Sequence, residues 1–132
     1  MGSISLSEKR LVITGGARGL GRAFVEAAIK AGARVVVADI LEDVGRQTVK
    51  KLSRLGEVYF ESVDLGDPGS IAALSERSIN QLGGVDGLVN CAAIATGIGG
   101  KTADEIDVET WDRVMTVNVR GTWLAVRAFS PA

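Results

Sequence analysis

A cluster of glycines near the N-terminus is the first feature of this 132-residue chain that could do chemistry. The segment Thr14–Gly21 contains Gly15, Gly19 and Gly21, spaced as Gly-x-x-x-Gly-x-Gly, between an apolar run and an amphipathic one. Glycines between a strand and a helix let the backbone approach a pyrophosphate, whose charge the helix N–H groups and dipole stabilise. An ordinary turn is the alternative, but this placement favours dinucleotide binding.

Two charged residues bear on which dinucleotide would bind. Asp39 ends the next apolar run, where a carboxylate can accept hydrogen bonds from a ribose diol and repel a 2′-phosphate. This favours NAD over NADP, and the alternative role for Asp39 is to cap the following helix. Arg18 beside the glycine turn could instead bind a 2′-phosphate, or it is a solvated surface side chain.

The composition excludes several classes of function. The chain has no histidine, which rules out Ser-His-Asp and Cys-His catalysis and removes the commonest metal ligand, so we expect no metal site. Its 15 basic and 16 acidic residues are scattered, which argues against nucleic acid as a partner. We find neither the apolar core of a signal peptide nor the ~20 apolar residues of a membrane span, and we therefore expect a cytoplasmic protein without a membrane partner.

Alternating apolar and amphipathic runs predict the elements that position these residues. Strands are expected over 10–14, 34–39, 58–63 and 87–90. Helices are expected over 19–31, 43–54 and 68–82, and a long one over 108–128 after a glycine-rich loop at 95–100. This order predicts an α/β fold, a Rossmann-type doubly wound parallel sheet with helices on both faces and ligands beyond the carboxyl ends of the strands. We expect residues 1–132 to form one dinucleotide-binding domain.

The order of the motifs resembles that of the short-chain dehydrogenase/reductase family. The motifs are the glycine turn, Asp64-Leu65 after the third strand, Asn90-Cys-Ala-Ala93 after the fourth, and Asn118 in the last helix. In that family the glycines hold the pyrophosphate, the acid after strand two selects NAD, and the aspartate after strand three contacts the adenine. The cofactor-binding residues that the resemblance implies are Gly15, Arg18, Gly19, Leu20, Gly21, Asp39, Asp64, Leu65, Asn90 and Ala92.

Some of these positions also have plainer interpretations. Asp64 could form an Asx-turn in Asp-Leu-Gly-Asp-Pro. The segment from Asn90 keeps the first residue of the family's Asn-Asn-Ala-Gly motif but loses its glycine, and Cys91 is interpreted as a small buried residue rather than a nucleophile. Asn118 matches the family's catalytic asparagine, and a structural asparagine, hydrogen-bonded if buried, is the alternative.

The rest of the family's catalytic set has no counterpart in these residues. There is no matching serine, and the only tyrosine, Tyr59, is not followed by lysine at the fourth position. Without a general acid to protonate the carbonyl oxygen, we expect the 132 residues alone to be inactive. The strand pattern ends after a fourth strand and a long helix that is apolar on more than one face. We therefore expect the N-terminal part of a longer domain, with the catalytic part absent.

The function that we predict is an NAD-dependent oxidoreductase that interconverts an alcohol and a carbonyl of a small-molecule substrate by hydride transfer. One alternative is an NADP-dependent reductase of the 3-oxoacyl carrier-protein reductase kind, with Arg18 on the 2′-phosphate. An alternative of another class is a non-catalytic nucleotide-binding or interaction module that uses the apolar last helix. By resemblance, that helix also packs between subunits, so we expect a homo-oligomer.

Overall fold

A parallel four-stranded sheet forms the centre of the computed structural model, which describes residues 4–95 and 97–131. Its strands are β1 (Arg10–Thr14), β2 (Arg34–Asp39), β3 (Val58–Ser62) and β4 (Gly87–Asn90), in the order β3-β2-β1-β4. The chain builds outward from β1 to β3 and then returns to place β4 on the other side of β1. The strand order therefore reverses between β1 and β4, which is where such a fold binds ligands.

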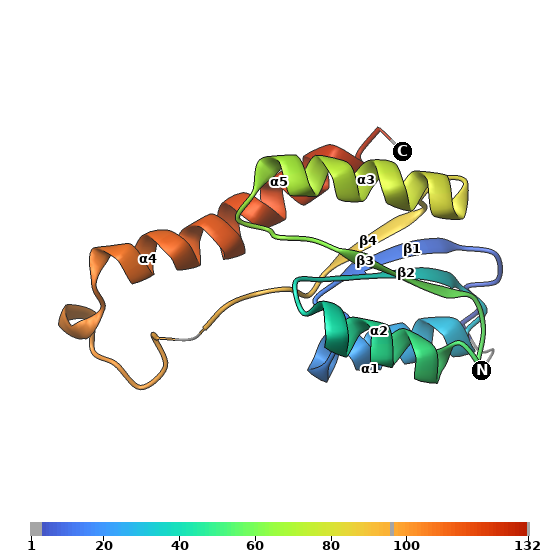
Figure 1. Ribbon diagram of the computed structural model, residues 1–132, viewed down its shortest axis with the longest axis horizontal. Coiled ribbons are helices and arrows are strands. Elements are labelled where there is room, and N and C mark those ends of the chain that lie inside the picture. The colour runs from blue at the N-terminus through green and yellow to red at the C-terminus, as the bar shows by residue number, and fades with distance from the viewer. Residues whose placement is uncertain (1–3, 96, 132) are drawn as a thin grey trace.

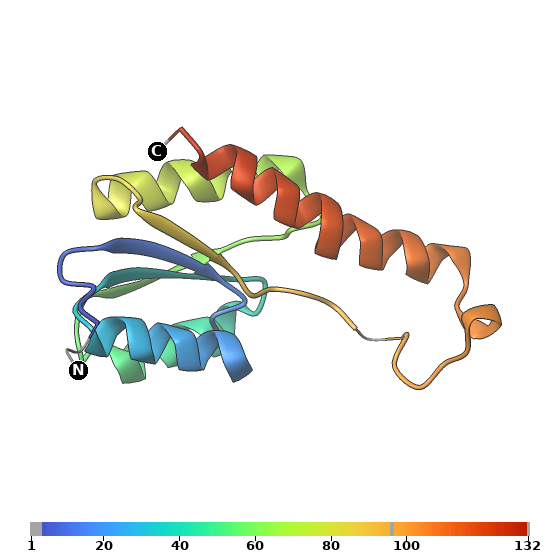
Figure 2. The ribbon, with the colours of Figure 1, turned by 180° about the vertical axis from the view of Figure 1, so that it is seen from behind.

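Helices cover both faces of the sheet, as expected for a doubly wound fold. Figure 1 and, from behind, Figure 2 show α1 (Gly19–Lys30) and α2 (Glu42–Leu52) on one face and α3 (Pro68–Leu82) and α5 (Thr122–Phe129) on the other. The fold class predicted from the sequence is thus confirmed. The bounds of β1, β2, β4 and α3 match the prediction, whereas β3 ends one residue earlier and α2 is shifted towards the N-terminus.

Strand β2 explains why the sheet has a hydrophobic core on each side. Successive side chains of a strand point to opposite faces, so Val35 and Val37 pack in the core under α1 and α2, while Val36 and Ala38 pack in the core under α3 and α5. All four are fully buried. An unbroken apolar run is therefore what this position requires, because it has no solvent-facing side.

The last helix follows the predicted span but is not one uninterrupted α-helix. It consists of α4 (Val108–Met115), the π-helical segment η2 (Thr116–Gly121) and α5, preceded by a short 3₁₀ helix η1 (Ala103–Glu105). At its end, η2 packs closely on the segment after β3, since a Cβ on Gly121 would lie 2.7 Å from the carbonyl oxygen of Leu65. The prediction of a regular helix is wrong here. Helical periodicity in the sequence does not indicate where such tertiary contacts form, and so it does not predict a π turn. The predicted loop at 95–100 includes residue 96, which lies outside the described residues.

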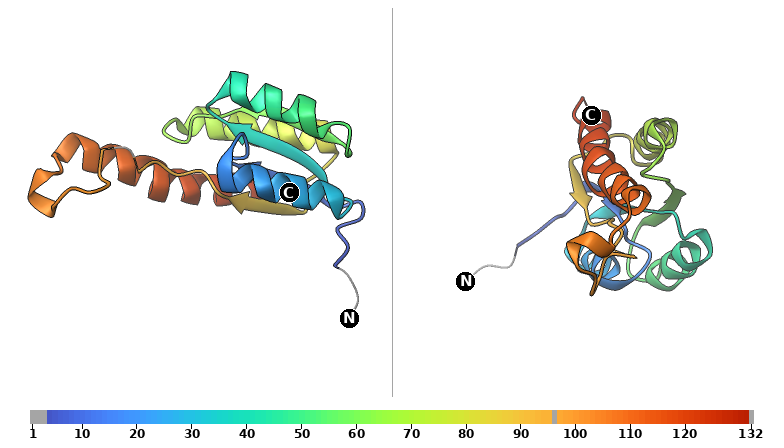
Figure 3. Two further views of the ribbon diagram at one scale, coloured as in Figure 1. Left: turned by 90° about the horizontal axis from the view of Figure 1, so that it is seen from below. Right: turned by 90° about the vertical axis from the view of Figure 1, so that its left-hand side faces the viewer.

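One face of this helix is buried and another is not. Leu124, Ala125 and Phe129 join the hydrophobic core, whereas α4 extends beyond the edge of the sheet (Figure 3). The exposed side, called here the outer face, carries large apolar side chains: Trp111, Met115, Val119, Trp123 and Val126. The expectation of apolar residues on more than one face is confirmed. No helix among the described residues combines the length and apolar character needed to cross a membrane.

An ion pair joins the start of β1 to the turn before β4. The Asp86 carboxylate accepts hydrogen bonds from Arg10 Nε at 3.0 Å and Nη2 at 3.1 Å, and from the Arg10 backbone N–H at 2.8 Å. These contacts hold the pKa of Asp86 at about 2, below its usual 3.8. Since the folded-state pKa is depressed, the stabilisation is present above pH 3.8 and is lost as the pH falls towards 2.

We therefore expect an Asp86→Asn variant to be less stable than the wild type at neutral pH, with the difference shrinking between about pH 4 and pH 2. Urea unfolding followed by circular dichroism over that range measures this difference. A gap between the two proteins that stays constant down to pH 2 would contradict the assigned role of the ion pair.

Candidate functional site

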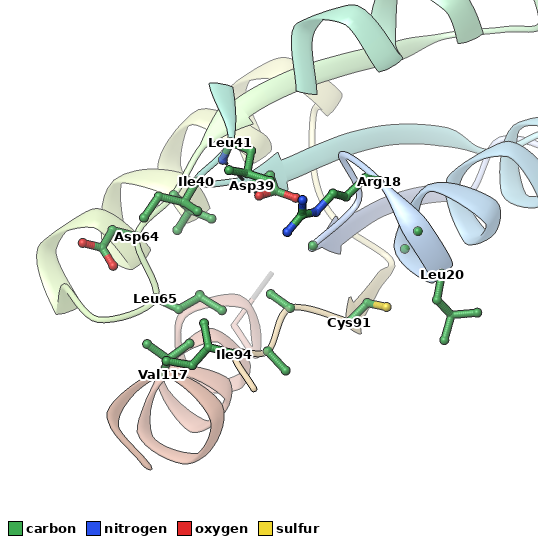
Figure 4. Close-up of a pocket in the computed structure, with 16 residues that line it drawn as sticks. Arg18, Leu20, Asp39, Ile40, Leu41, Asp64, Leu65, Cys91, Ile94 and Val117 are labelled. Carbon is green, nitrogen blue, oxygen red and sulfur yellow. Dashed lines mark hydrogen bonds between the residues drawn. The ribbon is translucent and has the colours of Figure 1, made fainter. Parts of the chain in front are cut away.

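A pocket of about 360 Å³ lies at the carboxyl ends of the strands. It is bounded by the glycine turn, the end of β2, the segments after β3 and β4, and η2 (Figure 4). Parallel strands end at one edge of the sheet, so residues far apart in the sequence meet there. Of the cofactor-binding residues expected from the sequence, those that line the pocket are Gly15, Arg18, Gly19, Leu20, Gly21, Asp39, Asp64, Leu65 and Ala92.

The glycines of the turn serve two different purposes. Gly15 and Gly21 are required by packing, because a Cβ would lie 2.8 Å from the Ala92 Cα at the first position and 2.0 Å from the Gly15 carbonyl oxygen at the second. Gly19 has φ +61, and a Cβ there would meet no atom within 4 Å. The space beside Gly19 is thus open, as a turn that holds a ligand against its backbone requires.

The N-terminus of α1, which follows this turn, is not capped by a side chain. Arg18 occupies the N-cap position without a side-chain hydrogen bond, and the first turn contains no acidic residue. Two other helices differ: Asp67 caps α3 and Asp107 caps α4. The first N–H groups and the positive end of the α1 dipole are therefore available to an anion in the pocket.

Asp39 is held at the pocket by the backbone on two sides. Its side chain is nearly buried, with the residue 8% exposed. One carboxylate oxygen accepts a hydrogen bond from the Ala17 N–H at 3.1 Å, and the other from the Leu41 N–H at 3.0 Å. The alternative role of capping the next helix is not observed, because the N-cap residue of α2 is Leu41 and no side-chain hydrogen bond caps that helix. Each carboxylate oxygen has a second lone pair with which it can bind a ligand.

Arg18 is exposed and also lines the pocket. Figure 4 shows its side chain reaching from the glycine turn towards the end of β2, where Asp39 lies. A cation and a carboxylate thus border the same part of the site, and they favour opposite cofactors.

The segment after β3 both borders the pocket and contains an Asx-turn. Asp64 is exposed at the rim of the pocket, and its Oδ1 accepts a hydrogen bond from the Gly66 N–H at 2.8 Å, which is the Asx-turn expected as the plainer interpretation. Leu65 is 6% exposed and forms part of the pocket wall. Arg120 of η2 donates to the Gly66 carbonyl at 2.9 Å and so fixes this segment against the last helix.

The two expected asparagines do not line the pocket. Asn90 is exposed at the end of β4, paired in register with Thr14. Asn118 lies in η2, where its Oδ1 accepts from the Ile94 N–H at 2.8 Å and its Nδ2 donates to the Ile94 carbonyl at 2.8 Å. Asn118 therefore acts on the pocket through Ile94, which lines it. The expectation that its amide is hydrogen-bonded is confirmed.

Thr14 is a residue that sequence reasoning treated only as part of the glycine motif. It is 1% exposed, and its hydroxyl oxygen accepts from the N–H groups of Cys91 at 3.2 Å and Ala92 at 3.3 Å. These bonds bring the segment after β4 against Gly15. A hydroxyl at the end of a buried strand needs hydrogen-bond partners. This requirement is the sequence feature that could have indicated the role of Thr14. Cys91 itself is half-buried at the pocket, less buried than expected.

No group of three or more Cys, Asp or Glu side chains in the described part of the chain could hold a metal ion.

Residues 9–132 match the family model described as short chain dehydrogenase. The chain belongs to the short-chain dehydrogenase family. A 2,5-dichloro-2,5-cyclohexadiene-1,4-diol dehydrogenase from Sphingobium indicum is 34% identical over 122 residues, which are 92% of this chain and 47% of that protein.

Solved structures share the fold of this chain. A short chain dehydrogenase/reductase from Burkholderia phymatum in complex with NAD superposes with a TM-score of 0.89 at 32% identity, covering 98% of this chain and 45% of that one. The Pseudomonas aeruginosa RhlG/NADP active-site complex superposes with a TM-score of 0.81 at 26% identity, covering 96% and 47%. The chain thus spans about half the length of each of these proteins.

Proposed function

We propose that this chain forms the cofactor-binding part of an NAD-dependent oxidoreductase that interconverts an alcohol and a carbonyl. The observation that carries the proposal is the nearly buried Asp39 carboxylate, fixed by two backbone N–H groups at the edge of the pocket. A carboxylate in this place can accept hydrogen bonds from the 2′- and 3′-hydroxyls of a ribose, and it repels a 2′-phosphate. A relative at 32% identity has been solved in complex with NAD.

Each part of a dinucleotide has a matching portion of the pocket. The open space at Gly19 and the uncapped N-terminus of α1 would hold the pyrophosphate. Asp39 would bind the ribose next to the adenine, and the segment of Asp64 and Leu65 would border the adenine. Ala92 and Ile94 would border the nicotinamide side, and Asn118 holds that wall in place. When bound, the cofactor supplies the hydride transfer.

The general acid of the reaction has no candidate in the described residues. The hydroxyl of Tyr59 donates to Glu57 at 2.9 Å, and Glu57 in turn binds Arg34, so this tyrosine lies at the start of the strands, opposite the pocket. Proton transfer requires a group within hydrogen-bond reach of the reacting oxygen. We therefore expect the 132 residues alone to bind cofactor without turning over an alcohol or a carbonyl.

Calorimetric titration with NADH and with NADPH tests which cofactor the chain prefers. We expect NADH to bind at least about tenfold more tightly, because a 2′-phosphate beside Asp39 adds like-charge repulsion. Tighter binding of NADPH would favour the alternative reductase, of the 3-oxoacyl carrier-protein reductase kind, in which Arg18 takes the 2′-phosphate. Binding of neither would favour the non-catalytic interaction module.

The outer face of the last helix supports a further part of the proposal. Five large apolar side chains are exposed along it, Trp111 and Trp123 each by 56%. Exposed apolar surface of this kind is typical of an interaction site, and we propose that it packs against another subunit in a homo-oligomer.

A further inference from the structure

The backbone of Ala17, in the middle of the glycine turn, is anchored on both sides of its Cα. Its N–H donates to Asp39 at 3.1 Å, and its carbonyl oxygen accepts from the hydroxyl of Thr48 at 2.6 Å. Both anchors are buried, with Thr48 2% exposed and Ala17 fully enclosed. Since peptide groups are planar, fixing the two that flank Ala17 leaves the turn little freedom.

Thr48 reaches the turn because α2 packs closely against the sheet at Gly45. Gly45 lies one helical turn earlier on the same face, and a Cβ there would lie 2.0 Å from the ring of Phe60 on β3. The missing side chain lets the helix approach and brings the Thr48 hydroxyl within hydrogen-bond distance of the turn. Thr48 does not line the pocket, so it could act on a ligand only through Ala17.

We propose that Thr48 is a positioning residue for cofactor selection, which sets the glycine turn so that the Ala17 N–H holds the Asp39 carboxylate facing the ribose. This inference rests on the proposed function, because it assigns Thr48 to the same nucleotide site. In a trans peptide the Arg18 N–H points opposite to the Ala17 carbonyl. By holding that carbonyl, Thr48 therefore also fixes the direction of the peptide that leads into α1.

The two cofactors depend on this arrangement to different degrees. Both place a pyrophosphate on the glycine turn, but only NAD gains from a carboxylate aimed at the ribose diol, whereas NADP is repelled by it. A looser turn therefore weakens the pyrophosphate contacts of both cofactors, and for NADH it also weakens the hydrogen bonds between the ribose and Asp39. The ratio of the two dissociation constants reports on the position of Asp39, and a general loss of stability would leave that ratio unchanged.

A Thr48→Val variant of the full chain tests the proposal, with NADH and NADPH titrated into it well below its unfolding temperature. Valine keeps the shape of threonine but cannot donate to Ala17. We expect NADH to bind about tenfold more weakly, and its preference over NADPH to fall by about threefold or more. The control Thr48→Ser keeps the hydroxyl, and its preference should stay within about twofold of the wild type.

If Thr48→Val does not fold, Thr48→Cys replaces it. Cysteine fills nearly the same volume as threonine, and its S–H group is only a weak donor to the Ala17 carbonyl. An unchanged NADH preference in the folded variant, while the wild type discriminates, would overturn the role of Thr48 and leave the proposed function standing. A wild type that binds neither cofactor, or that prefers NADPH, would overturn both.

Discussion

An Asp39→Ala, Gly19→Val double variant is expected to lose NADH binding, with the dissociation constant rising by at least about 100-fold. Removing the carboxylate deletes the charged acceptor for the ribose diol, and hydrogen bonds to charged groups contribute about 1.5–3 kcal/mol each. Valine at position 19 fills the open space beside the turn and is strained at φ +61. Both changes weaken NADH binding. Asp39→Ala removes an attraction, and Gly19→Val occupies space that the ligand needs. Calorimetric titration measures the loss.

The single variants separate these two causes. Asp39→Ala also removes the acceptor of the Ala17 and Leu41 N–H groups, so its folding must be checked by circular dichroism and thermal unfolding. Gly100→Val is the matched control for the glycine substitution, because Gly100 also has a positive φ of +76, a Cβ there also meets no atom within 4 Å, and the residue lies outside the pocket. Undiminished NADH binding by a folded double variant would refute the assignment of the pocket.

An Asn118→Ala variant is expected to lose about 2 kcal/mol of unfolding free energy. The amide makes two hydrogen bonds of 2.8 Å to the backbone of Ile94, and alanine would leave that N–H and carbonyl without partners in a half-buried place. The wall of the pocket formed by Ile94 would then be free to move away from η2. We therefore also expect weaker NADH binding, which a titration of the same variant measures.

Two further substitutions sharpen this test. Asn80 lies exposed on α3, and Asn80→Ala should change the unfolding free energy by no more than about 0.5 kcal/mol. Asn118→Asp keeps the oxygen that accepts from the Ile94 N–H but cannot donate to its carbonyl, so its stability should lie at or below that of the wild type. A loss in Asn118→Ala no larger than that in Asn80→Ala would show that Asn118 is not what holds Ile94.

Local sequence patterns determined most of the secondary structure and the edge of the sheet where the pocket lies. The apolar run at 34–39 predicted β2, and the amphipathic run at 68–82 predicted α3, which begins at Pro68 and ends before Gly83, whose φ is +80. The strand alternating with helix implied parallel strands, whose carboxyl ends meet. The glycine turn and Asp39 could therefore be placed at one pocket before any contact between them was known.

The tertiary structure alone decided how that pocket is held together. The bonds of Thr14 to the segment after β4, of Thr48 to Ala17 and of Asn118 to Ile94 join residues separated by up to 78 positions. It also decided the π turn in the last helix and the two-sided bonding of Asp39. Periodicity and propensity report burial and backbone preference within a short window. A buried polar side chain finds its partner only after distant segments pack together, and for that reason the sequence did not reveal these bonds.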